Sequence, residues 1–186
     1  GYVAIPTVIA SSNRKIPVIS HESDLTMGLA NKFMSKYCKK ILTSFPTTAK
    51  EVRNGEYSGS PIRRNLFNAN KSDALSFFGF SGKKPVLLVT GGSLGAKKIN
   101  MVLRSALPEL IKTFDVIHVC GKGNLDQSIN LDGYFQTEFL NKIENAFAIC
   151  SICVSRAGSN TLFELLSLEI PTLLIPLPKD VSRGDQ

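Results

Sequence analysis

The sequence has 186 residues, of which 43% are hydrophobic, so the chain can bury a core and belongs to the globular class. Its formal net charge of +7 favours acidic partners, such as nucleotide phosphates or an anionic membrane surface. Specific nucleic-acid recognition is not expected, because zinc-finger spacing, an RNP-like aromatic pattern and Trp are all missing from the sequence.

The four cysteines do not show the spacing of a disulfide framework. Cys150 and Cys153 form one C-x-x-C inside an apolar run, which favours buried free thiols in a reducing cytoplasm over a metal or redox site. No apolar run approaches the roughly 20 residues of a membrane-spanning helix. Because the sequence starts at Gly1 and stops at Gln186 without a clear terminus, we interpret it as an internal fragment.

The first predicted element is a short strand at residues 16–20 that runs into His21, Glu22, Ser23 and Asp24. Polar groups at the carboxyl end of a parallel strand can face a ligand crevice. Equally, Ser23 or Asp24 could cap the helix that follows.

A long amphipathic helix is predicted at residues 27–41, where apolar side chains recur at helical spacing opposite a group of lysines. The lysine face is either solvated or in contact with a membrane. A strand is expected at residues 41–45, and the polar stretch at 47–56 is expected to be a loop.

Small polar residues, Gly and Pro between Tyr57 and Arg63 indicate a connector, so we expect one domain to end near residue 58. An amphiphilic segment at residues 72–80 then opens the second domain. Arg63 lies beside this boundary, where it is either solvated or placed to meet a phosphate.

A glycine-rich turn, Gly91-Gly92-Ser93-Leu94-Gly95-Ala96, separates an apolar strand at 86–89 from a helix at 96–111. Glycines allow close backbone approach to an anion, and the helix amides and dipole attract it. The Ser93 hydroxyl could add a donor. The same glycines could also serve only to make the turn.

Strands and helices alternate through the rest of the chain, which predicts an α/β fold with parallel sheets. We expect strands at 116–120, 134–137, 149–155 and 172–177, and helices at 141–148 and 160–168. A second glycine-containing turn, Ser155-Arg156-Ala157-Gly158-Ser159-Asn160-Thr161, should point into the same crevice as the first. Glu164, expected near the first turn of its helix, could bind the two hydroxyls of a ribose or simply complement the helix dipole.

These motifs, together with His21-Glu22, Gly59-Ser60-Pro61-Ile62-Arg63 and Asp185-Gln186, resemble the MurG family of glycosyltransferases in order and spacing. The resemblance covers essentially the whole chain. It implies the GT-B architecture, in which two Rossmann-like domains flank a crevice. Residues 1–58 would be the end of the acceptor-binding domain, and residues 59–186 would be the donor-binding domain, truncated at its C-terminus.

The resemblance also implies roles for individual residues. On the donor side, Ser93 would contact the nucleotide phosphate, Leu140 would offer backbone groups to uracil, and Glu164 would hold the ribose. Amides of Ser159, Asn160 and Thr161 would face the diphosphate and sugar, Arg63 would line the crevice, and Gln186 would bind sugar hydroxyls. The acceptor side would hold Tyr2, His21, Glu22 and Asp24. The candidate general base would precede residue 1, with His21 as the candidate inside the chain.

Two departures from the family pattern affect these roles. The usual His-Glu-Gln-Asn is His21-Glu22-Ser23-Asp24 here, and Leu94 replaces a common Gln. These departures bear mainly on the acceptor contacts.

The implied activity is transfer of N-acetylglucosamine from UDP-N-acetylglucosamine to a muramyl-pentapeptide lipid carried on undecaprenol, at the cytoplasmic face of the bacterial membrane. The transfer would invert the anomeric centre and need neither a metal nor a cofactor, and the fragment alone would be inactive. Two alternatives remain: a GT-B enzyme with another lipid acceptor, and a non-catalytic module that binds nucleotide sugars.

Overall fold

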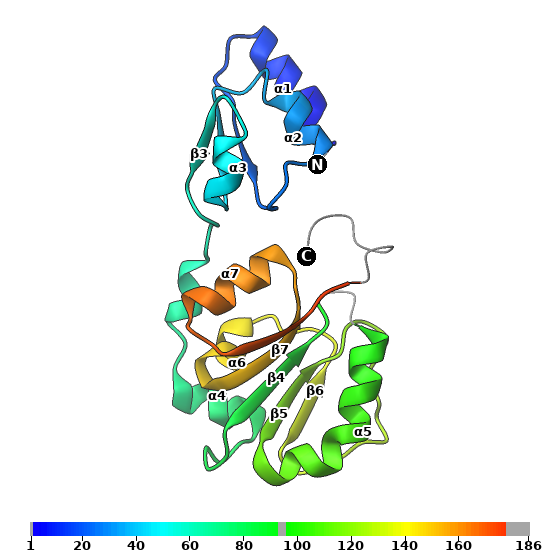
Figure 1. Cartoon of the computed structure of the whole chain (residues 1–186). Helices are drawn as coiled ribbons and strands as arrows, with labels where there is room; N and C mark the ends of the chain where they lie inside the picture. Colours follow the sequence, from blue (N-terminus) through cyan, green and yellow to red (C-terminus); the bar gives the residue numbers. More distant parts are fainter. Residues whose placement is uncertain (1, 93–95, 178–186) are drawn as a thin grey trace. The chain divides into compact units, whose positions relative to one another are not determined.

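The computed structural model describes residues 2–92 and 96–177, and Figure 1 shows their helices and strands. The chain divides into two compact units, one ending at Pro61 and the other spanning Ile62–Leu177. This division lies close to the boundary expected near residue 58. Ser93 and Gln186 fall outside the described residues, so their expected roles stay predictions.

The first unit is a small α/β structure. Its parallel sheet has the order β1 (Ile19–Glu22), β2 (Lys40–Thr43) and β3 (Gly55–Tyr57). Three helices accompany it: α1 (Ala4–Asn13), α2 (Leu29–Met34) and α3 (Pro46–Lys50). Apolar side chains from α1, α2, β2 and the adjoining loops form its core: Val8, Met27, Met34, Cys38 and Ile41.

The long helix predicted at residues 27–41 is wrong, because α2 ends at Met34. Beyond that point, the side-chain amide of Asn54 donates to the carbonyl oxygens of Ser35 and Cys38, at 3.0 and 2.7 Å. These two carbonyl groups therefore have hydrogen-bond donors without continuing the helix. Residues 35–39 lead from α2 into β2.

The loop predicted at residues 47–56 is also wrong, since α3 and β3 lie there. Pro46 occupies the first helical position, where its missing N–H costs nothing. Gly55 then begins β3 against the carbonyl of Ala49, and a Cβ at this position would collide with that carbonyl. In addition, β1 begins at Ile19 rather than at residue 16, and no element had been expected where α1 lies.

The second unit is a five-stranded, wholly parallel sheet in the order β6-β5-β4-β7-β8. The strands are β4 (Val86–Thr90), β5 (Asp115–Val119), β6 (Tyr134–Thr137), β7 (Cys150–Arg156) and β8 (Thr172–Ile175). The helices are α4 (Lys71–Phe78), α5 (Lys97–Thr113), α6 (Ile143–Ile149) and α7 (Ser159–Ser167), preceded by the 3-10 helix η1 (Arg64–Phe67). Each expected element of this region is present, with ends shifted by a few residues.

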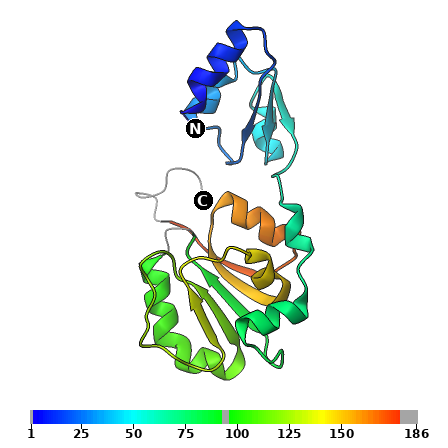
Figure 2. The ribbon, with the colours of Figure 1, turned by 180° about the vertical axis from the view of Figure 1, so that it is seen from behind.

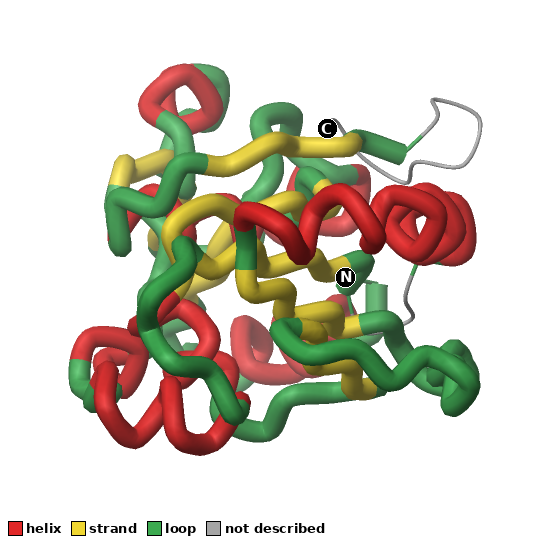
Figure 3. The backbone as a smooth tube through the Cα atoms, turned by 90° about the horizontal axis from the view of Figure 1, so that it is seen from below, coloured by secondary structure: helices red, strands yellow, loops and turns green. Residues whose placement is uncertain are grey.

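Helices cover both faces of this sheet, as Figures 1 and 2 show from opposite sides. Val86 and Leu88 of β4 pack toward a core shared with η1, α4, α6 and α7, whereas Leu87 and Val89 pack toward α5. This alternation follows from the two-residue period of a strand. β5 reaches β6 through a connection without a helix, residues 120–133, drawn as loop in Figure 3.

A buried polar network ties α5 to the sheet. The Asn100 side chain donates to the Cys120 carbonyl at 2.8 Å, which leaves its oxygen to accept from His118 Nε2 at 2.9 Å. Nε2 of His118 is therefore a donor, and its Nδ1 lies 2.8 Å from the Tyr134 hydroxyl oxygen. Burial, assisted by the charge of Arg104, lowers the pKa of His118 from 6.5 to about 4.

This network predicts a pH-dependent stability. Below pH 6.5 the unfolded chain protonates His118 while the folded chain does not until about pH 4, so stability falls as the pH falls through this window. Between pH 7 and pH 5 the free energy of unfolding should fall by about 2 kcal/mol through His118 alone. Urea unfolding of the wild-type and His118→Gln chains at both pH values measures this difference.

The matched control is His21→Gln, since the sequence has two histidines. We expect the His118 variant to lose this fall in stability, and the His21 variant shows whether removing a histidine elsewhere in the chain has the same effect. An unchanged pH dependence in His118→Gln would contradict the neutral, buried histidine.

Candidate functional site

The candidate site lies at the carboxyl ends of β4 and β7. From β4 the chain proceeds to β5 and β6 on one side, then returns to form β7 on the other side of β4. The strand order thus reverses between β4 and β7, whose last paired residues are Thr90 and Ser155. Ligands of open α/β sheets bind at such a reversal, beyond the carboxyl ends of the strands. The two glycine-containing turns follow these neighbouring strands, as the sequence predicted.

The first turn leads from β4 to α5, and residues 93–95 within it lie outside the described part of the chain. Gly92 has a φ of +81°, which favours glycine, and its amide donates to the Thr90 hydroxyl at 3.3 Å. α5 then begins without a side-chain cap and without an acidic residue in its first turn, where Lys97 and Lys98 lie instead. The positive end of the helix dipole and two cations therefore favour an anion here.

The second turn leads from β7 to α7. Gly158 is the N-cap residue, so no side chain caps α7, and a Cβ at Gly158 would have no neighbour within 4 Å. Ser159, Asn160 and Thr161 are the first three residues of α7, whose amides cannot have partners within the helix. This arrangement suits backbone binding of a phosphate at the N-terminus of α7.

Arg156 supports this edge of the sheet. Its guanidinium donates to the carbonyls of Ile175 and Pro176, at 3.3 and 3.0 Å, and so ties the end of β7 to the end of β8. The sequence alone does not predict this role, because the carbonyls that Arg156 contacts lie about twenty residues further along the chain.

Glu164 lies in the second turn of α7, not near its first turn as expected, so the dipole argument for it is weaker. Its side chain is 13% exposed and forms an ion pair with Arg63, whose Nη2 lies 2.9 Å from Oε1. The Nε of Arg63 donates to the same oxygen at 3.0 Å. Two expected site residues, far apart in sequence, are therefore in direct contact.

The loops after β5 and β6 are fastened to each other. Glu138 accepts a hydrogen bond from the Gly123 amide at 2.6 Å, and the Thr137 hydroxyl donates to the Phe139 carbonyl at 3.0 Å. Leu140 packs its side chain against the core of the second unit. The resemblance implies that a ligand would contact the backbone of Leu140.

In the first unit, the carboxylate of Glu22 is 5% exposed and fully engaged inside the protein. It accepts from the amides of Asp24 and Gly28, at 3.2 and 2.9 Å, and from the Asn31 side chain at 2.9 Å. Glu22 thus organises the loop before α2, and its expected acceptor-side role stays a prediction. Asn31 was missed by the sequence analysis, because no local pattern links it to Glu22.

His21 is partly buried, and its Nε2 lies 3.2 Å from the carbonyl oxygen of Gly59. This contact joins the end of β1 to the connector after β3. Asp24 is partly buried, whereas Tyr2 is 78% exposed. Their expected acceptor-side roles stay predictions.

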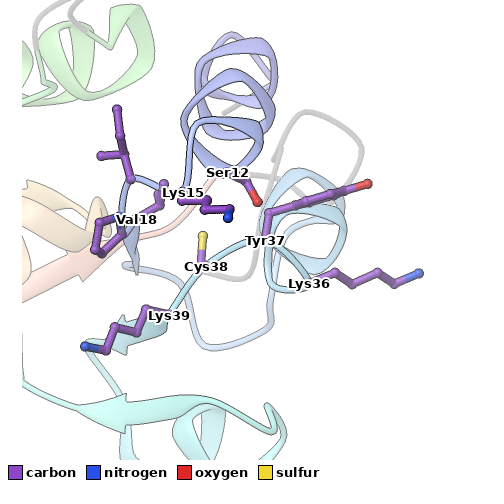
Figure 4. Close-up of a pocket in the computed structure, with 9 residues that line it drawn as sticks. Ser12, Lys15, Val18, Lys36, Tyr37, Cys38 and Lys39 are labelled. Atoms are coloured by element: carbon purple, nitrogen blue, oxygen red, sulfur yellow. The ribbon is translucent and has the colours of Figure 1, made fainter.

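A pocket of about 360 Å³ opens near the opposite ends of β1 and β2, lined by Ser12, Lys15, Tyr37 and Cys38 among others. Lys36 and Lys39 point away from its centre, as Figure 4 shows. Lys15 and Lys36 follow the C-termini of α1 and α2 by two residues, where cations complement the helix dipole. The lysines therefore have a structural explanation.

The cysteines are free thiols, and burial raises the pKa of Cys150 to about 11 and that of Cys153 to about 12. Within residues 2–92 and 96–177, His, Cys, Asp and Glu do not form a group that could hold a metal ion. None of the helices in these ranges combines the length and apolar character needed to cross a bilayer.

Comparison with known proteins identifies relatives of both units. Residues 86–186 match the glycosyltransferase family 28 C-terminal domain, and residues 1–43 match the N-terminal domain of that family. A Bacillus cereus protein, UDP-N-acetylglucosamine--N-acetylmuramyl-(pentapeptide) pyrophosphoryl-undecaprenol N-acetylglucosamine transferase 2, is 48% identical over 100% of this chain and 54% of its own length. The Clostridium perfringens transferase of the same description is also 48% identical, over 53% of its length.

Among solved structures, MurG of Acinetobacter baumannii superposes with a TM-score of 0.69 and 26% identity, over 97% of this chain and 52% of that protein. The glycosyltransferase of kitacinnamycin shares the fold, with a TM-score of 0.63 at 13% identity, over 96% of this chain and 57% of that one. The expected GT-B fold class and the resemblance to the MurG family are thereby confirmed. The chain spans about half the length of the curated relatives that it matches, and it belongs to glycosyltransferase family 28.

Proposed function

We propose that this chain supplies the donor-binding part of a transferase that moves N-acetylglucosamine from UDP-N-acetylglucosamine to a pyrophosphoryl-undecaprenol carrying N-acetylmuramyl-pentapeptide. The observation that supports it most is the pair of glycine-containing turns at the reversal between β4 and β7, each leading to a helix without a side-chain cap. The names of the Bacillus and Clostridium relatives supply the substrates.

In this proposal the diphosphate lies at the N-termini of α5 and α7. Negative charge grows on the UDP leaving group as the bond to the sugar breaks, and preorganised amides and dipoles stabilise it most at that point. Lys97 and Lys98 add positive charge at the same end of α5. We propose that this charge serves where other transferases use a divalent cation, so that donor binding requires no metal or cofactor.

The remaining donor contacts read the nucleoside and the sugar. Glu164 accepts hydrogen bonds from the ribose, and backbone groups of Leu140 match the edge of uracil. Ser93 and Gln186 complete the site at the phosphate and the sugar hydroxyls. The acceptor hydroxyl then displaces UDP directly, with inversion, while a general base removes its proton.

The acceptor also requires contact with a membrane, and the surface of α2 suits this role. Leu29 is 85% exposed and Phe33 is 45% exposed, one helical turn apart. Phe33 lies beside Tyr37, with ring centroids 5.7 Å apart, and Lys32 and Lys36 flank these apolar residues in the sequence. We propose that this surface binds the anionic cytoplasmic face of the membrane as a peripheral contact.

The two alternatives predict different behaviour. A GT-B enzyme with another lipid acceptor would bind the same donor but transfer to a different lipid. A non-catalytic module would bind UDP-N-acetylglucosamine, and the full-length protein would fail to transfer it to any acceptor. Assays of the full-length protein with the muramyl-pentapeptide lipid and with other undecaprenyl-linked lipids discriminate among the three.

Nucleotide selectivity tests the donor site. Because both turns contact phosphates and Glu164 contacts a ribose, selection of the base must come from the loop at Leu140. We expect the chain to bind UDP at least about tenfold more tightly than ADP, a difference of about 1.4 kcal/mol in binding free energy. A chelator that removes divalent cations should leave both affinities unchanged. Titration calorimetry measures both affinities, and equal affinities would contradict a uracil site.

Two substitutions at one position separate backbone from side-chain recognition. Leu140→Pro removes an amide donor and should erode the preference for UDP. Leu140→Ala should keep that preference and lower stability by about 1 to 2 kcal/mol, since the side chain packs on the core. Loss of the preference in Leu140→Ala would show that the side chain itself reads the base.

Glu164→Ala should weaken UDP binding by about 1.5 to 3 kcal/mol, the range for hydrogen bonds to a charged group, with less than about 1 kcal/mol lost in stability. Glu144→Ala is the matched control, because Glu144 also accepts a hydrogen bond from the segment after the connector, from Asn65 at 3.3 Å. Unchanged UDP affinity in Glu164→Ala would remove the ribose contact from the proposal.

Replacing Leu29 and Phe33 together by Ser should reduce binding to vesicles that contain anionic lipid, by about tenfold in partition coefficient. Met101 and Val102 in the second unit, 66% and 63% exposed, give a matched control pair of Ser substitutions. Co-sedimentation measures the partition, and equal losses in both double variants would contradict a specific membrane surface.

A further inference from the structure

The Glu164 carboxylate is held through only one of its oxygens. Nε of Arg63 donates a hydrogen bond to Oε1 at 3.0 Å, and Nη2 forms an ion pair with the same oxygen at 2.9 Å. Among the residues that the structure describes, none donates a hydrogen bond to Oε2. Oε1 is thus held by one hydrogen bond and by an ion pair with the same guanidinium, while Oε2 keeps its capacity to accept.

The backbones of both partners are anchored in the core of the second unit. Arg63 precedes η1, and its carbonyl accepts from the amide of Leu66 at 3.2 Å. Leu66 is 2% exposed. On α7, Leu165 follows Glu164 and is 1% exposed. The ion pair therefore joins two rigid attachment points and restricts the Glu164 side chain.

A free glutamate side chain loses rotamer freedom when it binds a ligand. The contact with Arg63 already restricts the Glu164 side chain in the folded protein. Less rotamer freedom is then lost when a ligand binds, and preorganised groups bind more tightly for this reason. Lysine cannot replace this contact fully, because its ammonium is a point charge without the planar pair of donors.

We propose that Arg63 is a positioning residue that acts through Glu164, fixing Oε1 so that Oε2 is presented to a ribose hydroxyl of the donor. This inference rests on the proposed function. It differs from a direct contact of Arg63 with the diphosphate, because it makes the effect of Arg63 depend on the hydroxyls of the ribose.

The test compares UDP with 2′,3′-dideoxy-UDP, which keeps the uracil and the diphosphate but lacks both hydroxyls. Titration calorimetry of the chain should show that Arg63→Ala weakens UDP binding about tenfold and dideoxy-UDP binding by no more than about twofold. Arg63→Lys should give an intermediate loss for UDP. Arg64→Ala, a substitution at the neighbouring exposed arginine, should change neither affinity.

A double-mutant cycle supplies the second readout. In a Glu164→Ala background, Arg63→Ala should weaken UDP by no more than about twofold further, because the carboxylate that it positions is gone. Equal weakening of UDP and dideoxy-UDP in Arg63→Ala would overturn the proposal and assign Arg63 to the diphosphate. Additive losses in the double variant would overturn it as well.

Failure of the proposed function gives a different pattern. If the wild-type chain binds no UDP, the nucleotide-sugar function fails and the inference fails with it. If Glu164→Ala weakens UDP selectively while Arg63→Ala does not, the ribose contact stands and only the positioning role of Arg63 is overturned.

Discussion

Parallel pairing of β4 with β7 is the constraint on which the candidate site depends. It aligns Thr90 with Ser155 and thereby brings together two turns that lie far apart in the sequence. The reversal of strand order at this pair also places α5 and α7 on opposite faces of the sheet. Two helix N-termini consequently approach one edge from both sides, which a single turn cannot achieve.

Carboxylates near the strand ends illustrate how this framework is held. Glu22 and Glu138 both accept backbone amides and so order loops, whereas Glu164 is fixed through one oxygen and keeps the other. A buried carboxylate must be paired or hydrogen-bonded, and each of the three meets this requirement differently. Glu138 and Glu164 are each engaged through one oxygen, and of these two Glu164 lies on the helix that follows the second turn.

Hydrophobic periodicity was enough to predict the second unit. Its central strand β4 is buried from Val86 to Val89 and reads as a continuous apolar run, and its turns carry glycine, so both signals are local. The first unit was predicted less well, because side chains distant in sequence decide its elements. Asn54 satisfies the carbonyls after α2, and Asn31 engages Glu22. The Arg63–Glu164 pair was likewise out of reach, since it depends on how η1 and α7 pack.

The most direct test of the account is amide hydrogen exchange of the chain with and without saturating UDP. Bound diphosphate should slow exchange at the N-terminal turns of α5 and α7, where backbone amides would become donors to it. The amino ends of β4 and β5, at the opposite edge of the sheet, should exchange as before. Slowing confined to that opposite edge or to the first unit would contradict a nucleotide site at the carboxyl ends of β4 and β7.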